Sequence, residues 1–345
     1  SSEKANINID QPPSGSDKDE VKVIWYSWIS DKKDTFSRFS LKPVIYKNTV
    51  ITSDLKYFRP EDEVLSAFEK HSGKLLWKWK DYYSSISGNE GIYFGDTKVM
   101  ENGKLYWAGE GSYYSITVDN GTTCKKIKSL DFGPTDNSFT HDFNVKDGLS
   151  IQSYGFPDLP FPDSLKFCLL DHEFNLTKSF TLMRMGEWYP HGVYTRVCIL
   201  ENDTLIIAPV RWLRKDSVSI EKSDVFCYSL NSDSIIWHYG ELDKHISKST
   251  LINQNKFYFV AGSDFYCLDI LTGRLVWKRS LNLPQAYRFV DPLTIADGKI
   301  FARNSIGDTY CLNASNGLVV WANTLDEETG ASGFAEGAKI EYYKG

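Results

Sequence analysis

The most regular copy of a repeated unit is Phe265-Tyr266-Cys267-Leu268-Asp269-Ile270-Leu271-Thr272-Gly273-Arg274-Leu275-Val276-Trp277. A small residue follows two aromatic residues, a glycine comes six positions later, and a tryptophan preceded by two aliphatic residues comes four positions after that. The small residue recurs at intervals of about 40 to 60 residues, at Ala67, Ser115, Cys168, Cys227, Cys267 and Cys311. A unit of this length, built from short strands, is typical of one blade of a β-propeller.

The unit that ends at Trp321 predicts the strands of a blade. Short apolar segments at 293–296, 299–302, 309–312 and 318–321 are separated by turn sequences such as Asp297-Gly298 and Asn316-Gly317. These dipeptides favour the tight turns that join antiparallel strands. Because no segment has a sustained helical period, the sequence predicts an all-β chain of four-stranded antiparallel blades.

The two ends of the chain each carry part of a unit. Val23-Ile24-Trp25 repeats the outer strand, whereas residues 337–343 resemble an inner strand with no tryptophan strand after it. We therefore expect residues 21–30 and 330–345 to share a last blade that closes the ring, which removes open sheet edges. Six complete units and this shared one predict a seven-bladed propeller, with residues 21–345 as a single domain.

Residues 1–20 differ from the rest because they are polar and have almost no aliphatic content, which is typical of a disordered tether. They represent either a cloning boundary in a cytosolic protein or an exported form that has lost its signal and its lipidated cysteine. We favour export, with a lipid anchor on that missing N-terminal cysteine. The net charge of −6 argues against a nucleic-acid partner, and no apolar run has the length of a membrane span.

The repeat also explains the cysteines and tryptophans. Four of the six cysteines occupy equivalent positions, which on neighbouring blades diverge too far for a disulfide. We predict no disulfide among Cys168, Cys227, Cys267 and Cys311, and expect Cys124 and Cys198 to be free as well. The repeated tryptophans are expected to fill the wedge between neighbouring blades as core residues.

The repeated pattern resembles the quinoprotein-type, or PQQ-like, propeller repeat over about residues 21–345. Members include quinone-dependent dehydrogenases, which share a pair of adjacent cysteines, a calcium-binding Glu/Asn/Asp set, a catalytic Asp and eight blades. This chain has no adjacent cysteine pair and no clear acidic cluster. The resemblance therefore favours the non-catalytic branch, which includes the propeller lipoprotein of the outer-membrane barrel-assembly machinery, and implies no PQQ, no metal and no catalytic residue.

A first candidate site lies at the mouth of the central channel. The loops that enter the innermost strands would surround this opening, and they carry Glu90, His141, Asp142, His191, Arg288, Asp291 and Glu336. Their spacings match no local zinc motif, so any site must be assembled in three dimensions. The alternatives are solvated loop residues or, as a second function, a glycan-acting or oxidising enzyme at the channel mouth.

A second candidate site lies in irregular segments of the third and fourth units. Residues 185–196 have no counterpart in the regular units, and residues 211–215 are expected to form an expanded turn. Extra loops rich in aromatic residues and arginine are common at interfaces and sugar-binding platforms. The candidate residues are Trp188, Tyr189, Arg196, Arg211 and Trp212; the alternative is a loop folded back on its own blade.

Together these observations predict a non-enzymatic, exported bacterial propeller that acts as a protein-interaction scaffold or as a ligand- or glycan-binding protein. Its expected location is the periplasm or the outer-membrane or cell surface, as a monomer whose partner is a protein or a glycan of the cell envelope.

Overall fold

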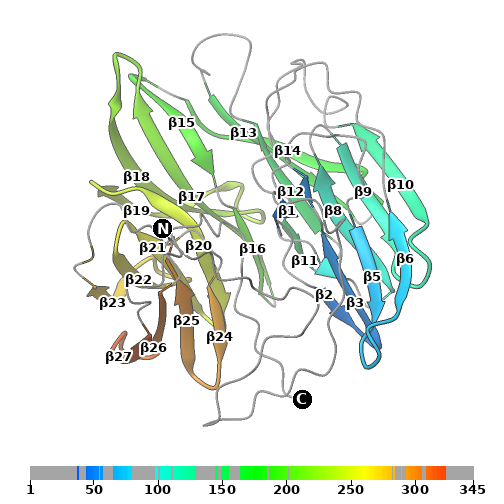
Figure 1. The fold of residues 1–345 in the computed structure, drawn as a ribbon. Helices are drawn as coiled ribbons and strands as arrows, with labels where there is room; N and C mark the ends of the chain where they lie inside the picture. Colours follow the sequence, from blue (N-terminus) through cyan, green and yellow to red (C-terminus); the bar gives the residue numbers. More distant parts are fainter. Residues whose placement is uncertain are drawn as a thin grey trace, which may run out of the picture.

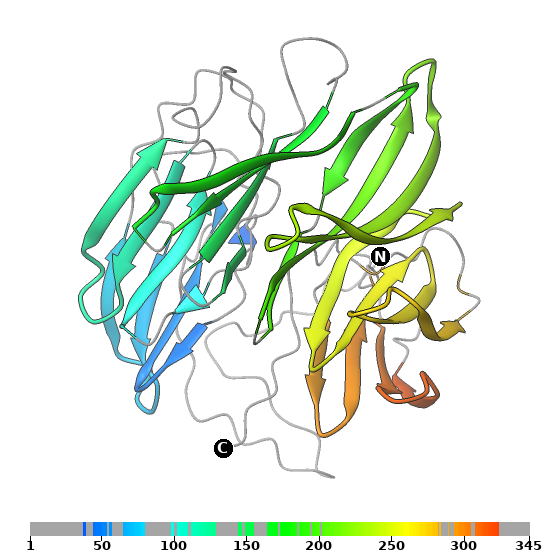
Figure 2. The same ribbon diagram turned by 180° about the vertical axis from the view of Figure 1, so that it is seen from behind.

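The computed structural model describes residues 37–38, 44–53, 55–56, 65–79, 98–99, 102–109, 112–128, 144–146, 149–154, 164–171, 173–184, 186–193, 195–200, 202–281, 283, 289, 293–304 and 308–323. This part of the chain is all-β and contains no helix, as the sequence predicts. Its sheets are arranged around a common centre as the blades of a propeller (Figures 1 and 2).

Each blade is an antiparallel sheet built from strands that are close together in the sequence, and its inner strand faces the common centre. Blade one contains β2 (Val44–Tyr46), β3 (Thr49–Ser53), β5 (Leu65–Glu69) and β6 (Leu75–Trp79). Blade two contains β7 (Lys98–Val99), β8 (Lys104–Gly109), β9 (Ser112–Thr117) and β10 (Thr123–Lys128). Blade three contains β11 (Asn144–Lys146), β12 (Leu149–Tyr154), β13 (Ser164–Leu170) and β14 (Leu176–Arg184).

Blade four has five strands: β15 (Trp188–Val193), β16 (Arg196–Ile199), β17 (Thr204–Arg214), β18 (Ser217–Ser229) and β19 (Ser234–Leu242). Blade five contains β20 (Ile246–Asn253), β21 (Lys256–Ala261), β22 (Asp264–Asp269) and β23 (Leu275–Ser280). Blade six contains β24 (Thr294–Ala296), β25 (Lys299–Arg303), β26 (Thr309–Asn313) and β27 (Val319–Asn323). Its strands confirm the prediction made for that unit.

The predicted number of seven blades is not confirmed. The described residues form five four-stranded sheets and one five-stranded sheet, besides the short pair of β1 (Ser37–Arg38) and β4 (Leu55–Lys56). The tether at 1–20 and the closing segments 21–30 and 330–345 lie outside the described residues. The structure therefore establishes the propeller arrangement but not its closure.

The core lies between neighbouring blades. One cluster of buried side chains joins blades one and two, and others join blades three and four, four and five, and five and six. Three tryptophans contribute to these joints, as the sequence predicts. The indole N–H groups of Trp77, Trp237 and Trp277 donate to backbone carbonyls of the next blade, those of Val118 (2.7 Å), Ile270 (2.6 Å) and Ala314 (3.0 Å).

Each of these indole rings lies against a glycine of the same neighbouring blade. A Cβ atom added at Gly273 would lie 2.6 Å from the ring of Trp237, and one added at Gly317 would lie 2.5 Å from the ring of Trp277. Both glycines also have a positive φ, which disfavours any other residue. The glycine of the repeat is therefore required both by the turn and by the tryptophan that covers it.

The cysteines Cys198, Cys227, Cys267 and Cys311 are buried and free, and Cys124 is exposed and free, which confirms the prediction for these five. The side chain of Cys168 lies outside the described residues. Its predicted repeat position was wrong by one residue, because Leu169 pairs with Lys178 as Cys267 pairs with Trp277. The turn of blade three is one residue shorter: Asp171 is bonded to Asn175, whereas Asp269 is bonded to Arg274.

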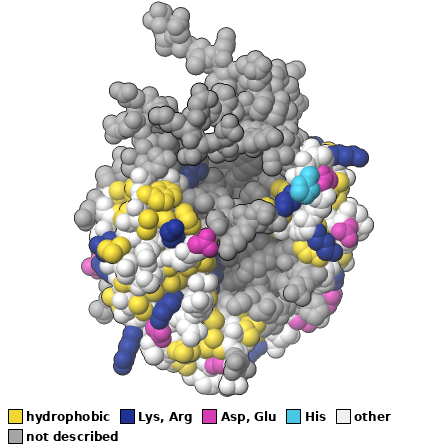
Figure 3. Space-filling model, turned by 90° about the horizontal axis from the view of Figure 1, so that it is seen from below, with side chains coloured by type: hydrophobic (Ala, Val, Ile, Leu, Met, Phe, Trp, Pro, Cys, Tyr) yellow, Lys and Arg dark blue, Asp and Glu magenta, His cyan; other side chains and the backbone are white. Residues whose placement is uncertain are grey.

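The outermost strands expose the aliphatic pairs that precede the tryptophans, including Leu75, Leu76, Ile235, Ile236, Leu275 and Val276. On the face seen in Figure 3, hydrophobic side chains of the described blades lie among lysine, arginine and acidic side chains. Exposed apolar atoms mixed with charges in this way are ordinary for a soluble surface.

Candidate functional site

The channel-mouth residues are not brought together by the described part of the structure. His191 lies within β15, but its side chain is outside the described residues. Glu90, His141, Asp142, Arg288, Asp291 and Glu336 also lie outside them. Their convergence on one opening stays a prediction.

The irregular segments of the fourth unit form strands instead of loops. Residues 188–193 are β15 and residues 196–199 are β16, and both pair with β17. Residues 211–214, predicted as part of an expanded turn, continue β17 up to a tight turn at Lys215. The loop predictions were wrong because the pairing of β17 with β18 continues past the length of an ordinary blade, from Leu205 and Ser229 to Leu213 and Glu221, and resumes after a register shift at Arg214 and Ser217.

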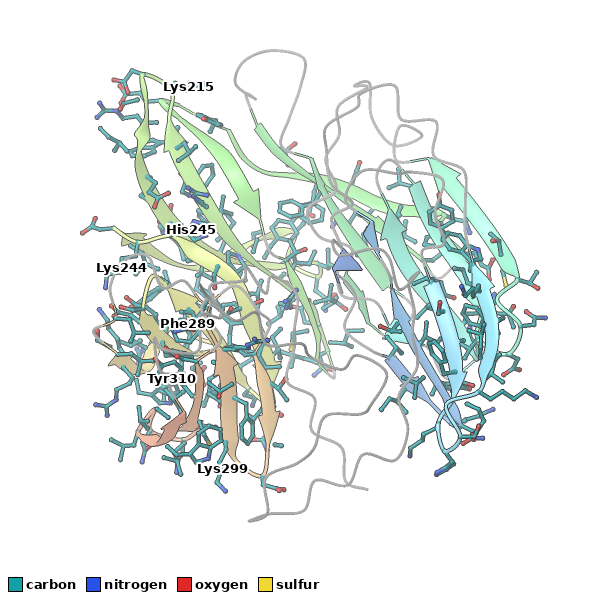
Figure 4. All side chains as sticks on the ribbon, viewed as in Figure 1. Lys215, Lys244, His245, Phe289, Lys299 and Tyr310 are labelled. Atoms are coloured by element: carbon teal, nitrogen blue, oxygen red, sulfur yellow. The ribbon has the colours of Figure 1, made fainter. Side chains whose placement is uncertain are left out.

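We call residues 188–193, 210–214 and 217–222 the blade-four extension. Its three strands project beyond the rest of the blade, with Lys215 at the tip (Figures 1 and 4). The outer strand β19 reaches β18 only up to Ser223, so residues 217, 221 and 222 pair with β17 alone in the described structure. Strands of a sheet hold side chains more precisely than loops do, which suits a recognition surface.

Two of the predicted binding residues point into the core. Trp212 is only 3% exposed and meets Phe226 edge-on, with ring centroids 6.3 Å apart. It belongs to the cluster that joins blades three and four. Tyr189 is also buried. The prediction that Trp212 and Tyr189 form a ligand surface is not supported, since both side chains are buried, although they lie on opposite faces of the sheet.

The arginines predicted as binding residues are engaged in structural contacts. The guanidinium group of Arg211 donates to one carboxylate oxygen of Glu221 on the next strand, at 2.8 and 2.5 Å. Arg196 lies on β16 and donates to the carbonyl of Thr195 at 3.1 Å and to that of Thr250, on β20, at 3.5 Å. Arg211 therefore stabilises the hairpin of β17 and β18, and Arg196 links the innermost strands of blades four and five.

The outward part of the extension combines an aromatic ring, cations and an apolar side chain. Trp188 is half-buried, and the ammonium group of Lys222 lies 4.8 Å from the centre of its ring. Ile220, on the strand edge beside Lys222, is 39% exposed. Near the tip, Arg214 pairs with Asp216 at 2.5 Å. Ile220 and Lys222 were missed by the sequence analysis, although their spacing of two residues in a strand would have placed them on one face.

A histidine–carboxylate pair lies below the extension on the same blade. The Nε2 atom of His238 is 3.2 Å from Oδ1 of Asp224, a buried carboxylate, and the imidazole stacks on Phe226 with centroids 4.6 Å apart. The pair consists of two groups only, and the described residues contain no cluster of three His, Cys, Asp or Glu side chains suited to a metal.

The comparisons with known proteins agree with the propeller fold. Residues 213–342 match the family model described as "Outer membrane protein assembly factor BamB". Within this range the repeats are similar to those of that family. No curated protein matches the chain.

Among solved structures, the crystal structure of BamB from Moraxella catarrhalis matches with a TM-score of 0.50 and 11% identity, covering 83% of this chain and 77% of that one. The computationally designed Ika8 protein matches with a TM-score of 0.47 and 10% identity, covering 84% of this chain and 88% of that one. At these identities, the likeness to BamB shows the fold alone. In the described residues, no helix has the length and apolar character needed to cross a membrane.

Proposed function

We propose that this chain is a non-enzymatic propeller of the bacterial cell envelope that binds partner proteins through the blade-four extension. The observation that carries the proposal is the pairing of β15, β17 and the first half of β18 into a sheet that projects beyond the rest of the blade. The other described blades have no such projection. The match of residues 213–342 to a family described as an outer-membrane protein assembly factor supports a role in assembly.

The chemistry of the extension suits a protein partner. Interfaces combine a buried aromatic or aliphatic anchor with a polar rim. Ile220 and the ring of Trp188 supply apolar area, and Lys222 and the Arg214–Asp216 pair supply the rim. The Arg211–Glu221 contact holds the hairpin in one geometry before binding, which lowers the entropy lost on association.

The finer features of the proposal rest on the sequence. We propose that the chain is exported and that residues 1–20 are a tether to a lipid anchor, which would hold a monomeric propeller of seven blades at a membrane surface. A glycan is the alternative ligand, since an aromatic ring beside a cation also suits a sugar.

Site-specific photo-cross-linking tests the proposal. A photoreactive amino acid replaces Ile220 or, as a matched control, Ile45 of blade one, which is 38% exposed and so has nearly the same exposure. We expect a discrete protein adduct in the native host from position 220 but not from position 45, and its loss when Lys222→Glu is added. Equal adduct patterns at the two positions would remove the extension as the binding surface.

A further inference from the structure

The turn that joins β13 to β14 in blade three departs from the repeat at one position. The turn runs from Asp171 to Asn175, and in it Phe174 holds the position that Gly273 has in blade five. The φ of Phe174 is 59° and that of Gly273 is 68°, so the backbone follows the same path. A bulky side chain is uncommon at such a φ because the backbone is strained there. Blade three therefore carries an aromatic ring where blades one, two, five and six have a glycine.

Blade two supplies a lysine at this joint in place of the repeated tryptophan. Lys125 pairs with Ser115, as the tryptophans of other blades pair with the small residue of the repeat. Its ammonium group donates a hydrogen bond to the backbone carbonyl of Glu173, in the turn of blade three. The indole N–H groups at the tryptophan joints also donate to backbone carbonyls of the next blade. Lys125 thus makes the polar contact of a tryptophan joint without supplying a ring.

The ring at this joint comes from blade three instead. Phe174 is buried and meets the ring of Tyr106, in blade two, edge-on with centroids 5.8 Å apart. The hydroxyl group of Tyr106 is buried as well and has no hydrogen-bond partner. A buried hydroxyl without a partner costs free energy relative to one that is bonded to water. The closed joint therefore carries two costs, the strained φ of Phe174 and the unpaired hydroxyl of Tyr106, and both can relax when the joint opens.

Charged groups hold the joint between blades two and three closed. The Nζ atom of Lys104 lies 3.2 Å from Oε1 of Glu173, and the two side chains are 28% and 47% exposed. Together with Lys125, two lysines of blade two thus contact one residue of blade three. Attraction between charges that are this accessible to water weakens as the ionic strength rises. The contacts at the tryptophan joints are uncharged, so salt does not weaken them in this way.

The joint on the other side of blade three has a second source of stability. It also contains a lysine, Lys178, whose ammonium group lies 2.5 Å from the carboxylate of Asp233 in blade four. In addition, a cluster of buried side chains packs across it, including Phe167 from blade three and Ile206 and Phe226 from blade four. Salt does not screen apolar burial, so blade three stays attached to blade four when the charged contacts weaken.

We propose that the joint between blades two and three is a salt-sensitive seam at which the propeller opens, with blade three moving away from blade two together with blade four. Opening separates Lys104 and Lys125 from Glu173, and it exposes the facing rings of Tyr106 and Phe174 to water. The closed form predominates at low ionic strength, and rising ionic strength shifts the population toward the open form. The seam adds a moving part to the propeller, which goes beyond the proposed binding at the blade-four extension.

Distances between two spin labels, measured by double electron–electron resonance in the full chain, test the proposal. One pair of labelled cysteines replaces Thr122 of blade two and Leu176 of blade three. The control pair replaces Arg274 of blade five and Val319 of blade six, which occupy the equivalent positions in the turns and outer strands of their blades. All four positions are exposed, so the labels should disturb the packing little.

The measurement is made at two salt concentrations, with Cys124 and Cys168 changed to serine so that neither takes a label. At about 0.05 M sodium chloride we expect one distance for each pair, and at about 1 M a second, longer distance for the pair across the seam alone. An unchanged distribution for that pair would overturn the proposal. Equal changes in both pairs would also overturn it, because salt would then act on the propeller as a whole.

A matched pair of substitutions tests the role of the ion pair. Lys104 and Lys256 occupy equivalent positions, because they pair with Thr117 and Asp269. Lys104 forms its ion pair across the seam, whereas Lys256 forms one of 2.9 Å with Asp269 inside its own blade. Lys104→Gln should therefore populate the longer distance across the seam already at low salt, and Lys256→Gln should leave it unchanged. If the two variants behave alike, the Lys104–Glu173 contact does not hold the seam closed and the proposal fails.

A last variant restores the residues of a tryptophan joint. Lys125→Trp combined with Phe174→Gly should keep the short distance across the seam at both salt concentrations, since the joint then depends on uncharged contacts. A longer distance at high salt in this variant would rule out the lysine contacts as the cause of opening. None of these measurements involves a binding partner, so their failure is distinguishable from a failure of binding at the blade-four extension.

Discussion

The ammonium group of Lys178 lies 3.5 Å from the carbonyl oxygen of Leu230 and donates a hydrogen bond to it. Leu230 is the third residue after Cys227, so its carbonyl is equivalent to those that accept from Trp237 and Trp277 at other joints. The same ammonium group forms an ion pair of 2.5 Å with Asp233, which replaces the glycine of the repeat at a φ of 54°. Between blades three and four, Lys178 and Asp233 thus make the contact that a tryptophan and a glycine make at other joints.

This equivalence predicts that the two substitutions needed to restore a tryptophan joint depend on each other. Lys178→Trp alone should destabilise the chain, because the ring would meet the side chain of Asp233. Asp233→Gly alone should change stability little, since an exposed ion pair contributes little. The double variant should be more stable than Lys178→Trp, with a positive coupling between the sites. Urea unfolding of all four proteins measures this coupling.

Salt provides the control for that experiment. High ionic strength screens an exposed ion pair, so it should weaken the joint of the parent protein and leave the double variant unchanged. If the two substitutions are additive at low salt, Lys178 does not occupy the position of the tryptophan.

A second prediction separates the two demands on the glycine of the repeat. Gly317→Ala must adopt a φ of 70° and also places a Cβ 2.5 Å from the ring of Trp277, whereas Gly298→Ala must adopt a φ of 69° in open space. Positive φ alone costs about 1 kcal/mol for alanine, and overpacking adds roughly 1–3 kcal/mol. Gly317→Ala should therefore unfold at a clearly lower urea concentration than Gly298→Ala. If the two variants lower the urea midpoint equally, the ring of Trp277 moves aside without a cost in stability.

The regular parts of the fold could be predicted from the sequence because each depends on local residues. Turn dipeptides such as Asp297-Gly298 indicate a tight turn by their residue types alone. In the same way, the large apolar rings of Trp237 and Trp277 indicate buried positions. The contact of Lys178 between blades three and four could not be predicted. Lys178 reaches a carbonyl that is distant in sequence, and a lysine does not resemble the tryptophan found at this position in other blades. The blade-four extension was missed for a similar reason: Pro209 and the charges around it argue against a long strand.

The position of Pro209 explains why β17 tolerates it. A proline lacks the N–H that a central strand needs, and it is accepted where pairing is interrupted. Opposite Pro209, the inner edge of β17 changes partner from β15, which ends at Val193, to β16, which begins at Arg196. The interruption depends on both strands together and is invisible in the sequence of either.

A third prediction concerns the free thiols. Burial raises the pKa of Cys227 to about 12 and that of Cys267 to about 11, and it also raises the pKa of Cys311. Thiolate, not thiol, is the reactive form. In a Cys168→Ser background, a thiol reagent such as DTNB should modify only Cys124 in the native protein, since it is the exposed cysteine of the remaining five. All five should react in denaturant. More than one rapidly reacting thiol in the native state would contradict the burial of the repeat cysteines.

The last prediction concerns Asp264, a carboxylate that is 2% exposed and accepts from Lys244 at 2.8 Å and from Lys278 at 3.0 Å. Burial alone would raise its pKa, but hydrogen bonds from Lys244, Ser280 and Lys278 outweigh it and hold the pKa below its ordinary value. The stabilisation from these contacts is fully present above the pKa of an unfolded aspartate, about 3.9, and is lost as the pH falls through the lower folded value.

Asp264→Asn removes these charged contacts and should therefore destabilise the chain by about 2 kcal/mol at neutral pH. The stability difference from the parent protein should stay constant between about pH 7 and pH 5 and shrink below about pH 4, where the parent carboxylate becomes protonated. Urea midpoints measured across this range test the prediction, with Asp243→Asn at an exposed neighbouring site as the control. A difference that grows on acidification would mean that the folded state binds the proton more tightly than the unfolded chain, which would require burial to dominate over the two lysines.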